Sequence, residues 1–182
     1  LASAIEARNL GARTVLLEKN EELGGTTSWS IGSFTATQTP HQIAAGIDDS
    51  PEQHFEDMPK FAGTDAGRDN LALRRLFVDN ANETLRWLMS MGVEFYGPMP
   101  EPPHTKPRMH NVLPNSRAYI HLLRRHAELI GVDIHCGVRA ERFLLNENRV
   151  VGIYGVGPNG PVEIAARAVV LASGDYAASA SL

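Results

Sequence analysis

The feature that most constrains the fold of this chain is the run from Val15 to Phe34. A short apolar stretch ends on an acid, Glu18, and a polar turn then leads to the paired glycines Gly24 and Gly25. Small and hydroxyl-bearing residues follow, so that bare backbone amides and hydroxyls can face an anion. In a dinucleotide-binding α/β domain, the acid that closes the second strand accepts hydrogen bonds from a ribose. The run therefore predicts a nucleotide site on an α/β fold.

The residues before Glu18 have the lengths that such a domain needs. The sequence predicts a helix over Leu1–Leu10, ended by Gly11, and a buried strand over 13–18. The dinucleotide fingerprint places its acid about 20 residues after a glycine-rich turn, which puts that turn at or before Leu1. We therefore expect a fragment that lacks the first strand and the glycine turn. Two alternatives stay open: Glu18 is a solvated acid at a strand end, and the paired glycines form a flexible turn.

Further elements follow from periodicity and from Gly and Pro positions. Helices are predicted over 69–91 and 116–130, a helix start at Ser50-Pro51, and an extended surface loop over 97–107. The apolar face of the first of these helices is predicted to comprise Leu73, Leu76, Phe77, Asn80, Thr84, Trp87, Leu88 and Met91. Strands are predicted over 132–136, over 142–145, 150–156 and 162–165 as antiparallel hairpins, and over 168–172 as a buried apolar strand. This order predicts a mixed α/β fold with a small antiparallel layer.

Composition excludes several classes of protein. The chain has 182 residues, 43% of them hydrophobic, and a net charge of −4 without a Lys/Arg cluster, which argues against a nucleic-acid partner. No apolar run approaches the roughly 20 residues of a transmembrane helix. The single cysteine excludes an internal disulfide and a cysteine-built metal site, and the cytoplasm is the default location. The neighbouring acids Asp48-Asp49 and Glu21-Glu22 are interpreted as solvated turns, and no metal site is expected.

In order along the chain, several segments resemble the flavoprotein subunits of fumarate reductase and succinate dehydrogenase, a family that includes the 3-ketosteroid Δ1-dehydrogenases. These segments are Glu18-Lys19, Gly24 to Ser28 with Gly32, Arg108-Met-His110, Leu122 to Ile134, Val150 to Ile153, and Ala168 to Gly174. The resemblance implies a Rossmann-like FAD-binding domain of the glutathione-reductase type. Residues 1–34 and 131–182 would form its nucleotide-binding core and 35–130 a mostly helical insert, with the capping domain absent from this chain.

The resemblance also assigns cofactor-binding roles. Glu18, followed by Lys19, would hold the adenosine ribose, and Val138 or Ala140 would offer backbone to the adenine. The residues lining the pyrophosphate and flavin would be Gly24, Gly25, Thr26, Thr27 and Ser28, with Ser30 and Gly32 near the isoalloxazine. Ala172, Ser173 and Gly174 would pack on the AMP half, although Asp175 stands where the family has a second glycine. Non-covalent FAD is expected because no histidine lies between Leu1 and Pro40, with His41 just beyond.

Catalytic residues are expected mostly outside this chain, because the family takes them from a capping domain and C-terminal segments. Tyr96, Arg108 and His110 are weak candidates for lining the substrate cleft, and His110 is alternatively a loop residue bound to backbone. The expected reaction is hydride transfer between flavin and a C–C bond next to a carbonyl or carboxylate, on a dicarboxylate, enoate or steroid-like substrate, with an unidentified electron partner. The alternatives are a non-catalytic fragment unable to bind FAD and another FAD enzyme, such as a hydroxylase or amine oxidase.

Overall fold

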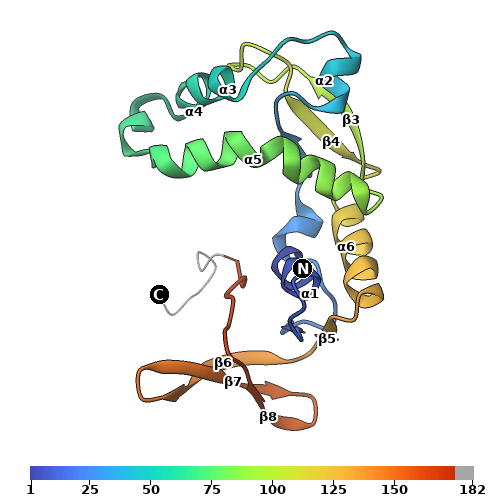
Figure 1. The fold of residues 1–182 in the computed structure, drawn as a ribbon, viewed down its shortest axis with the longest axis vertical. Helices are drawn as coiled ribbons and strands as arrows, with labels where there is room; N and C mark the ends of the chain where they lie inside the picture. Colours follow the sequence, from blue (N-terminus) through green and yellow to red (C-terminus); the bar gives the residue numbers. More distant parts are fainter. Residues whose placement is uncertain (175–182) are drawn as a thin grey trace. The chain divides into compact units, whose positions relative to one another are not determined.

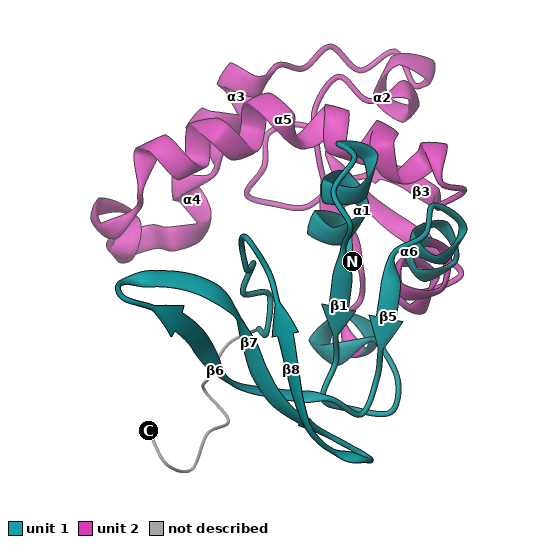
Figure 2. Ribbon diagram, turned by 60° about the horizontal axis from the view of Figure 1, so that its bottom comes forward, with its two compact units in different colours: residues 1–28, 123–182 teal, residues 29–122 magenta. Residues whose placement is uncertain are grey.

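The computed structural model describes residues 1–174 and divides the chain into two compact units. Unit 1 comprises residues 1–28 and 123–182, and unit 2 comprises residues 29–122 (Figure 2). The division into a nucleotide-binding core and an insert at 34/35 and 130/131 stays a prediction, whereas the two compact units divide at 28/29 and 122/123. Helix α6 (Arg117–Leu129) and the 3-10 turn η1 (Gly25–Trp29) each continue across one of these boundaries.

Unit 1 contains a small parallel sheet and an antiparallel sheet (Figure 1). Helix α1 (Ala2–Asn9) leads into β1 (Val15–Leu17), which pairs in parallel with β5 (Asp133–His135). Gly11 adopts a φ of 86° at the end of α1, as the predicted helix stop requires. The Arg8 side chain donates from Nε to the Ile130 carbonyl at 2.7 Å and so joins α1 to the turn after α6.

The antiparallel sheet of unit 1 confirms the predicted hairpins. Strands β6 (Arg139–Asn146), β7 (Arg149–Gly157) and β8 (Gly160–Ala165) pair in sequence order. The sheet is close-packed at Gly155, where an added Cβ would lie 2.6 Å from the Arg139 carbonyl oxygen.

The predicted buried strand over 168–172 is wrong. These residues are not part of any strand, and Val170 and Leu171 are 68% and 70% exposed. A strand requires a hydrogen-bonded neighbour, and among the described residues none pairs with this segment. An apolar composition alone therefore does not make it a strand.

Unit 2 is built on a three-stranded antiparallel sheet in the order β2-β4-β3. Its strands are β2 (Ser33–Thr35), β3 (Glu94–Met99) and β4 (Met109–Leu113). Because β3 continues to Met99, the surface loop predicted from Gly97 begins three residues later than expected.

The helices of unit 2 are α2 (Pro40–Ala44), α3 (Pro51–Asp57), α4 (Pro59–Ala62) and α5 (Leu71–Ser90), with a 3-10 turn, η2 (Gly63–Arg68), before α5. All of these helices except α4 begin at a side-chain cap. The hydroxyl of Thr39 accepts from the Gln42 amide, and that of Ser50 from the Gln53 amide, so α2 and α3 each start with a capped turn and a proline.

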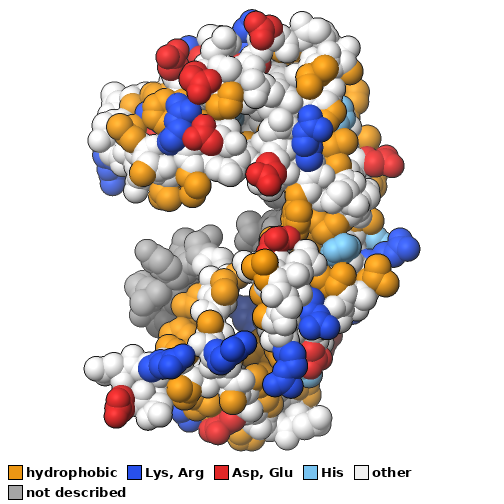
Figure 3. All heavy atoms as spheres, in the orientation of Figure 1, with side chains coloured by type: hydrophobic (Ala, Val, Ile, Leu, Met, Phe, Trp, Pro, Cys, Tyr) orange, Lys and Arg blue, Asp and Glu red, His pale blue; other side chains and the backbone are white. Residues whose placement is uncertain are grey.

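The predicted buried face of α5 is wrong. The residues buried on this helix are Arg74, Val78, Ala81, Leu85 and Leu88. Leu73, Leu76 and Phe77 are exposed, and exposed hydrophobic side chains are visible on the surface of unit 2 (Figure 3). Leu88 is the one residue common to both faces. Apolar residues lie on two sides of the helix, and the sequence does not say which side is buried.

Candidate functional site

Glu18 and Val138 lie side by side at the carboxyl ends of the two parallel strands in unit 1. The Glu18 amide donates to the His135 carbonyl at 2.9 Å, and the Val138 amide donates to the Glu18 carbonyl at 2.9 Å. A third bond, from the Gly137 amide to the Asn20 carbonyl at 2.8 Å, extends this pairing past the strands. Two predicted site residues that are 120 positions apart in sequence are thereby brought together at the sheet edge where open α/β folds bind ligands.

The Glu18 carboxylate is held in one orientation. Its Oε1 accepts from the Asn20 amide at 2.8 Å and from Asn20 Nδ2 at 2.9 Å. Its Oε2 makes no hydrogen bond to any residue that the structure describes. A partly exposed carboxylate with one fixed and one available oxygen is suited to accept hydrogen bonds from neighbouring hydroxyls, as on a ribose. The neighbouring Lys19 is exposed.

The glycine pair after the turn has two distinct roles. Gly24 has a φ of 151°, which L residues rarely adopt, and a Cβ there would lie 2.3 Å from Ser28 Oγ, so the turn disfavours a side chain at this position. Gly25 has a φ of 52°, and a Cβ there would meet nothing within 4 Å. Gly25, Thr26 and Thr27 are exposed. The backbone at Gly25 is therefore open to a ligand, whereas Gly24 shapes the turn.

Ser30 and Gly32 belong to unit 2. Gly32 has a φ of 79°, and a Cβ there would lie 2.6 Å from Val112 Cγ1 and 3.0 Å from Ser116 Cβ. Its carbonyl accepts a hydrogen bond from the Tyr119 hydroxyl at 2.8 Å. Gly32 is thus fixed against β4 and the start of α6.

The remaining predicted cofactor residues lie on exposed backbone of unit 1. Ala140 is on β6, opposite Gly155, and is exposed. Ala172, Ser173 and Gly174 are exposed in the segment that ends the described part of the chain. Asp175, which departs from the family pattern, lies outside the described residues.

The three weak cleft candidates fall into two groups. Tyr96, on β3, is 62% exposed, whereas Arg108 and His110 are 0% exposed. His110 lies on β4, not on a loop; it bonds the Phe34 carbonyl through Nδ1 at 3.2 Å and the Thr39 hydroxyl through Nε2 at 2.9 Å. Since Arg108 and His110 are fully buried within unit 2, the structure gives neither a surface on which to meet a substrate.

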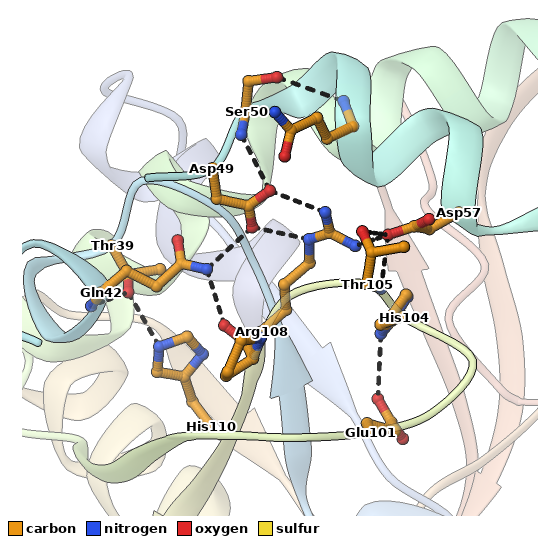
Figure 4. Close-up of polar contacts among 12 residues, drawn as sticks. Thr39, Gln42, Asp49, Ser50, Asp57, Glu101, His104, Thr105, Arg108 and His110 are labelled. Atoms are coloured by element: carbon orange, nitrogen blue, oxygen red, sulfur yellow. Dashed lines mark hydrogen bonds and ion pairs between the residues drawn. The ribbon is translucent and has the colours of Figure 1, made fainter. Parts of the chain in front are cut away.

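Arg108 is the centre of a buried ionic cluster that sequence reasoning missed (Figure 4). It donates from Nε and Nη2 to the two oxygens of Asp49, both at 2.7 Å, and from Nη1 to Asp57. Asp49 also accepts from Gln42 Nε2 at 2.9 Å, and Asp57 from Thr105. The interpretation of Asp49 as a solvated turn is therefore wrong. The partners lie 59 and 51 residues from Arg108, too far apart for a local pattern to signal them.

This environment shifts several pKa values in unit 2. Burial raises the pKa of the Asp57 carboxyl, but the hydrogen bonds from Lys60, Thr105 and Arg108 outweigh it and hold that pKa well below its usual range. Burial, with nearby Arg108 and His104, lowers the pKa of His54 to about 4. Burial likewise lowers the pKa of His110. Both histidines are therefore neutral near pH 7.

His41, the nearest histidine to the flavin-side segment in sequence, is also engaged. Its Nε2 lies 3.2 Å from the Phe95 carbonyl, to which only a protonated nitrogen can donate. Among residues 1–174 there is no group of three or more His, Cys, Asp or Glu side chains arranged to hold a metal ion. Within the same residues, no helix has the length and apolar character to cross a membrane.

Comparison with known proteins decides the family. A family described as an FAD binding domain matches residues 1–181. The chain belongs to this FAD-binding domain family. Its cofactor is therefore FAD, as the resemblance implied, and its fold is the expected mixed α/β FAD-binding fold.

Relatives and solved structures agree with this assignment. The chain is 26% identical over its full length to NADH:fumarate oxidoreductase of Klebsiella pneumoniae (strain 342), and 28% identical over 96% of its length to a probable fumarate reductase, Ifc3, of Shewanella frigidimarina (strain NCIMB 400). It spans only 20% and 30% of those two proteins.

Two solved structures extend the comparison. A flavocytochrome c3 fumarate reductase in an open conformation matches 96% of the chain with a TM-score of 0.87 and 26% identity; the chain covers 31% of it. A 3-ketosteroid-Δ4-(5α)-dehydrogenase from Rhodococcus jostii RHA1 matches 91% of the chain with a TM-score of 0.77 and 25% identity; the chain covers 41% of it.

The geometry of unit 1 fits the nucleotide half of FAD. It supplies a carboxylate with an available oxygen at Glu18, adjacent backbone at Val138, and open backbone at Gly25. These are the groups that a ribose, an adenine and a pyrophosphate require.

Proposed function

We propose that the protein containing this chain is an FAD-dependent oxidoreductase that transfers a hydride between flavin and a C–C bond next to a carbonyl or carboxylate. The observation that carries the proposal is the family match over residues 1–181, joined to the apposition of Glu18 and Val138 at one sheet edge. Because the chain spans a minor part of its relatives, the activity and substrate of the whole protein are inferred from what those relatives are named for.

Each cofactor-binding residue has a proposed part. Glu18 accepts hydrogen bonds from the adenosine ribose, with Lys19 beside it, and the backbone of Val138 and Ala140 borders the adenine. Gly24, Gly25, Thr26, Thr27 and Ser28 line the pyrophosphate and flavin, Ser30 and Gly32 border the isoalloxazine, and Ala172, Ser173 and Gly174 border the AMP half. When bound, FAD supplies the hydride chemistry; the residues of this chain bind and orient it.

The substrate is proposed to be a dicarboxylate, an enoate or a steroid-like ketone. Fumarate reductases and a ketosteroid dehydrogenase among the similar proteins support these classes. Bound FAD is proposed to be non-covalent, since His41, the nearest histidine after the flavin-side segment, already bonds the Phe95 carbonyl. A substrate-cleft role for Tyr96 is compatible with its exposure.

The test uses the full-length protein. Flavin released by heat should be identified as FAD by chromatography and mass, which also checks that it is not covalently attached. After anaerobic reduction, addition of fumarate, an α,β-unsaturated acid or a 3-ketosteroid should reoxidise the flavin, followed at its visible absorption bands. Colourless protein that takes up no added FAD would contradict cofactor binding. Flavin reoxidised by oxygen but by none of the C=C acceptors would instead favour a hydroxylase or amine oxidase.

A further inference from the structure

The segment Trp29–Phe34 has little burial of its own to hold it. Trp29 and Ile31 are 83% and 81% exposed, and β2, which begins at Ser33, contains three residues and lies at an edge of its sheet. β2 pairs with β4, the Ser33 hydroxyl donates to Asn111 Oδ1 at 2.8 Å, and the Phe34 ring lies edge-on to Phe95 with centroids 6.2 Å apart. Because short edge strands open locally at low free-energy cost, further contacts from other elements add to the order of this segment.

Tyr119 makes the first of these contacts. Its hydroxyl donates to the Gly32 carbonyl at 2.8 Å, and its ring packs on Phe95 with centroids 6.1 Å apart. Phe95 is a core residue of unit 2, so the ring position is set by the core. Burial raises the pKa of Tyr119 to about 12, so the hydroxyl stays a neutral donor throughout the physiological range.

His110 makes the second contact, two residues further along. Its Nδ1 must carry the proton, because its partner is the Phe34 carbonyl, an acceptor. In the neutral ring Nε2 then accepts from the Thr39 hydroxyl, whose oxygen in turn accepts from the Gln42 amide. The tautomer of His110 is thus determined by its partners.

A buried hydrogen-bond network supports His110 through Thr39 (Figure 4). Gln42 donates from Nε2 to Asp49 and to the Pro107 carbonyl, and Asp49 pairs with Arg108 through two hydrogen bonds. Thr39, Gln42, Asp49 and Arg108 are all buried. Gln42 Oε1 has no hydrogen-bond partner among the described residues, but the other hydrogen bonds of the network restrain one another in a low-dielectric interior. They therefore restrain the His110 ring that donates to the Phe34 carbonyl.

We propose that Tyr119 and His110 are positioning residues that hold the Trp29–Phe34 segment in place against the flavin. The inference rests on the proposed function, which places Ser30 and Gly32 beside the isoalloxazine. Carbonyls two residues apart, Gly32 and Phe34, are each held by a side chain from a different element, α6 and β4. A shift of this segment would misplace the backbone next to the reacting ring, and a misplacement on the order of 1 Å can cost about a hundredfold in rate.

The first test replaces Tyr119 with Phe in the full-length, FAD-loaded enzyme. The ring stays and one hydrogen bond to Gly32 is lost. We expect kcat to fall by about tenfold or more, with a smaller change in KM, and the visible spectrum and midpoint potential of bound flavin to shift. Tyr154→Phe, on β7, is the matched control and should leave kcat, spectrum and potential unchanged. A Tyr119→Phe enzyme with the parent's kcat, spectrum and potential overturns the role of Tyr119, even if its melting temperature falls.

The second test reaches His110 through Thr39. Thr39→Val removes the hydroxyl that His110 accepts from, whereas Thr39→Ser retains it. Since Thr39 also caps α2, Ser50→Ala supplies a control that loses the cap of α3 without touching His110. We expect Thr39→Val to lower kcat and shift the flavin spectrum, and Thr39→Ser and Ser50→Ala to retain the parent values. If Thr39→Val has the same kcat and flavin spectrum as Ser50→Ala, the role of His110 is overturned. If Tyr119→Phe does not fold, the Thr39 series decides the proposal.

Failure of this inference is distinguishable from failure of the proposed function. If the parent protein binds FAD and reduces a C=C acceptor while all the variants match it, the positioning roles fail and the function stands. If the parent protein binds no FAD, the proposed function fails and the inference fails with it.

Discussion

Arg108 shows how a single residue organises part of unit 2. A guanidinium can be buried here because Asp49 and Asp57 accept from Nε, Nη1 and Nη2. The pairing joins the residue before β4 to the segment from Asp49 to Asp57. Removing one member of a buried ionic cluster leaves the others charged without a partner, which typically costs about 3–5 kcal/mol. The contact between α3 and the 100–108 loop therefore depends on the charges of Arg108 and Asp57.

His54, next to this cluster, should make stability depend on pH. Its folded-state pKa of about 4 lies below the ordinary value of 6.5, because it is buried and faces Arg108 and His104, with Asp49 and Asp57 acting in the opposite direction. The unfolded chain therefore binds the proton first as pH falls. The stabilisation is full above pH 6.5 and is lost on acidification, by about 2 kcal/mol between pH 7 and pH 5.

Denaturant unfolding of the protein and of a His54→Gln variant at pH 7 and pH 5 measures this contribution. The variant should lose less stability on acidification than the parent, by roughly that amount. His121→Gln, at an exposed position of α6, is the control and should follow the parent. Identical pH dependence in the parent and in His54→Gln would show that His54 does not titrate as its burial requires.

Contacts between residues that are distant in sequence differ in how far they can be predicted. The family resemblance assigned Glu18 and Val138 to the same nucleotide, and the structure shows that they are adjacent, because each follows a strand of one parallel pair. Asp49 could not be recognised as buried, since its partner Arg108 lies 59 positions away in a proline-rich stretch. Tyr119 was not singled out at all, because nothing in its helical context signals the Gly32 carbonyl. Pairings made by tertiary structure leave no local pattern.

Among the elements, α5 offers the clearest check on packing. Leu85 is fully buried on the face that includes Val78, Ala81 and Leu88, whereas Leu76 is 61% exposed on the face that the sequence favoured. Leu85→Ala should lower the free energy of unfolding by about 2–5 kcal/mol, because it leaves a cavity in the core. Leu76→Ala makes the same chemical change at an exposed site and should change it by about 0.5 kcal/mol or less. Thermal or denaturant unfolding of the two variants compares them, and a larger loss in Leu76→Ala would restore the face expected from the sequence.

The predicted helices and hairpins differ from the 168–172 segment in how well periodicity predicts them. The helices, the hairpins and the short parallel strands follow from Gly, Pro and alternation, and the structure confirms them within a few residues. The 168–172 segment has the composition of a buried strand but no pairing partner among the described residues. Strand formation is a property of two segments together, so it is the least predictable feature when only one of them is examined.

At the scale of the molecule, the residues predicted to bind FAD fall in the sequence ranges of both units. Unit 1 carries Glu18, Val138 and the Gly24–Ser28 turn, and unit 2 carries Ser30 and Gly32. The nucleotide site stays a prediction, and the sequence could suggest it because most of its residues lie in the run from Glu18 to Gly32 or follow strands. The buried ionic cluster of unit 2 was not predictable, because Asp49 and Arg108 lie 59 positions apart, with several helices and a strand between them.

Removal of FAD from the full-length protein should lower its free energy of unfolding, because a ligand that binds only the folded state adds RT ln(1 + [L]/Kd), about 2.7 kcal/mol at a hundredfold excess over Kd.

If Glu18 holds the adenosine ribose, Glu18→Leu should weaken FAD binding by about tenfold or more, because a charged hydrogen-bond acceptor is lost. The same variant should leave FMN binding unchanged, because FMN has no adenosine half. Melting temperatures of apoprotein titrated with FAD and FMN measure both, with Glu21→Leu, on the exposed turn, as the matched control. Equal losses of FAD and FMN affinity in Glu18→Leu would show that Glu18 supports the fold of the site and does not contact the ribose.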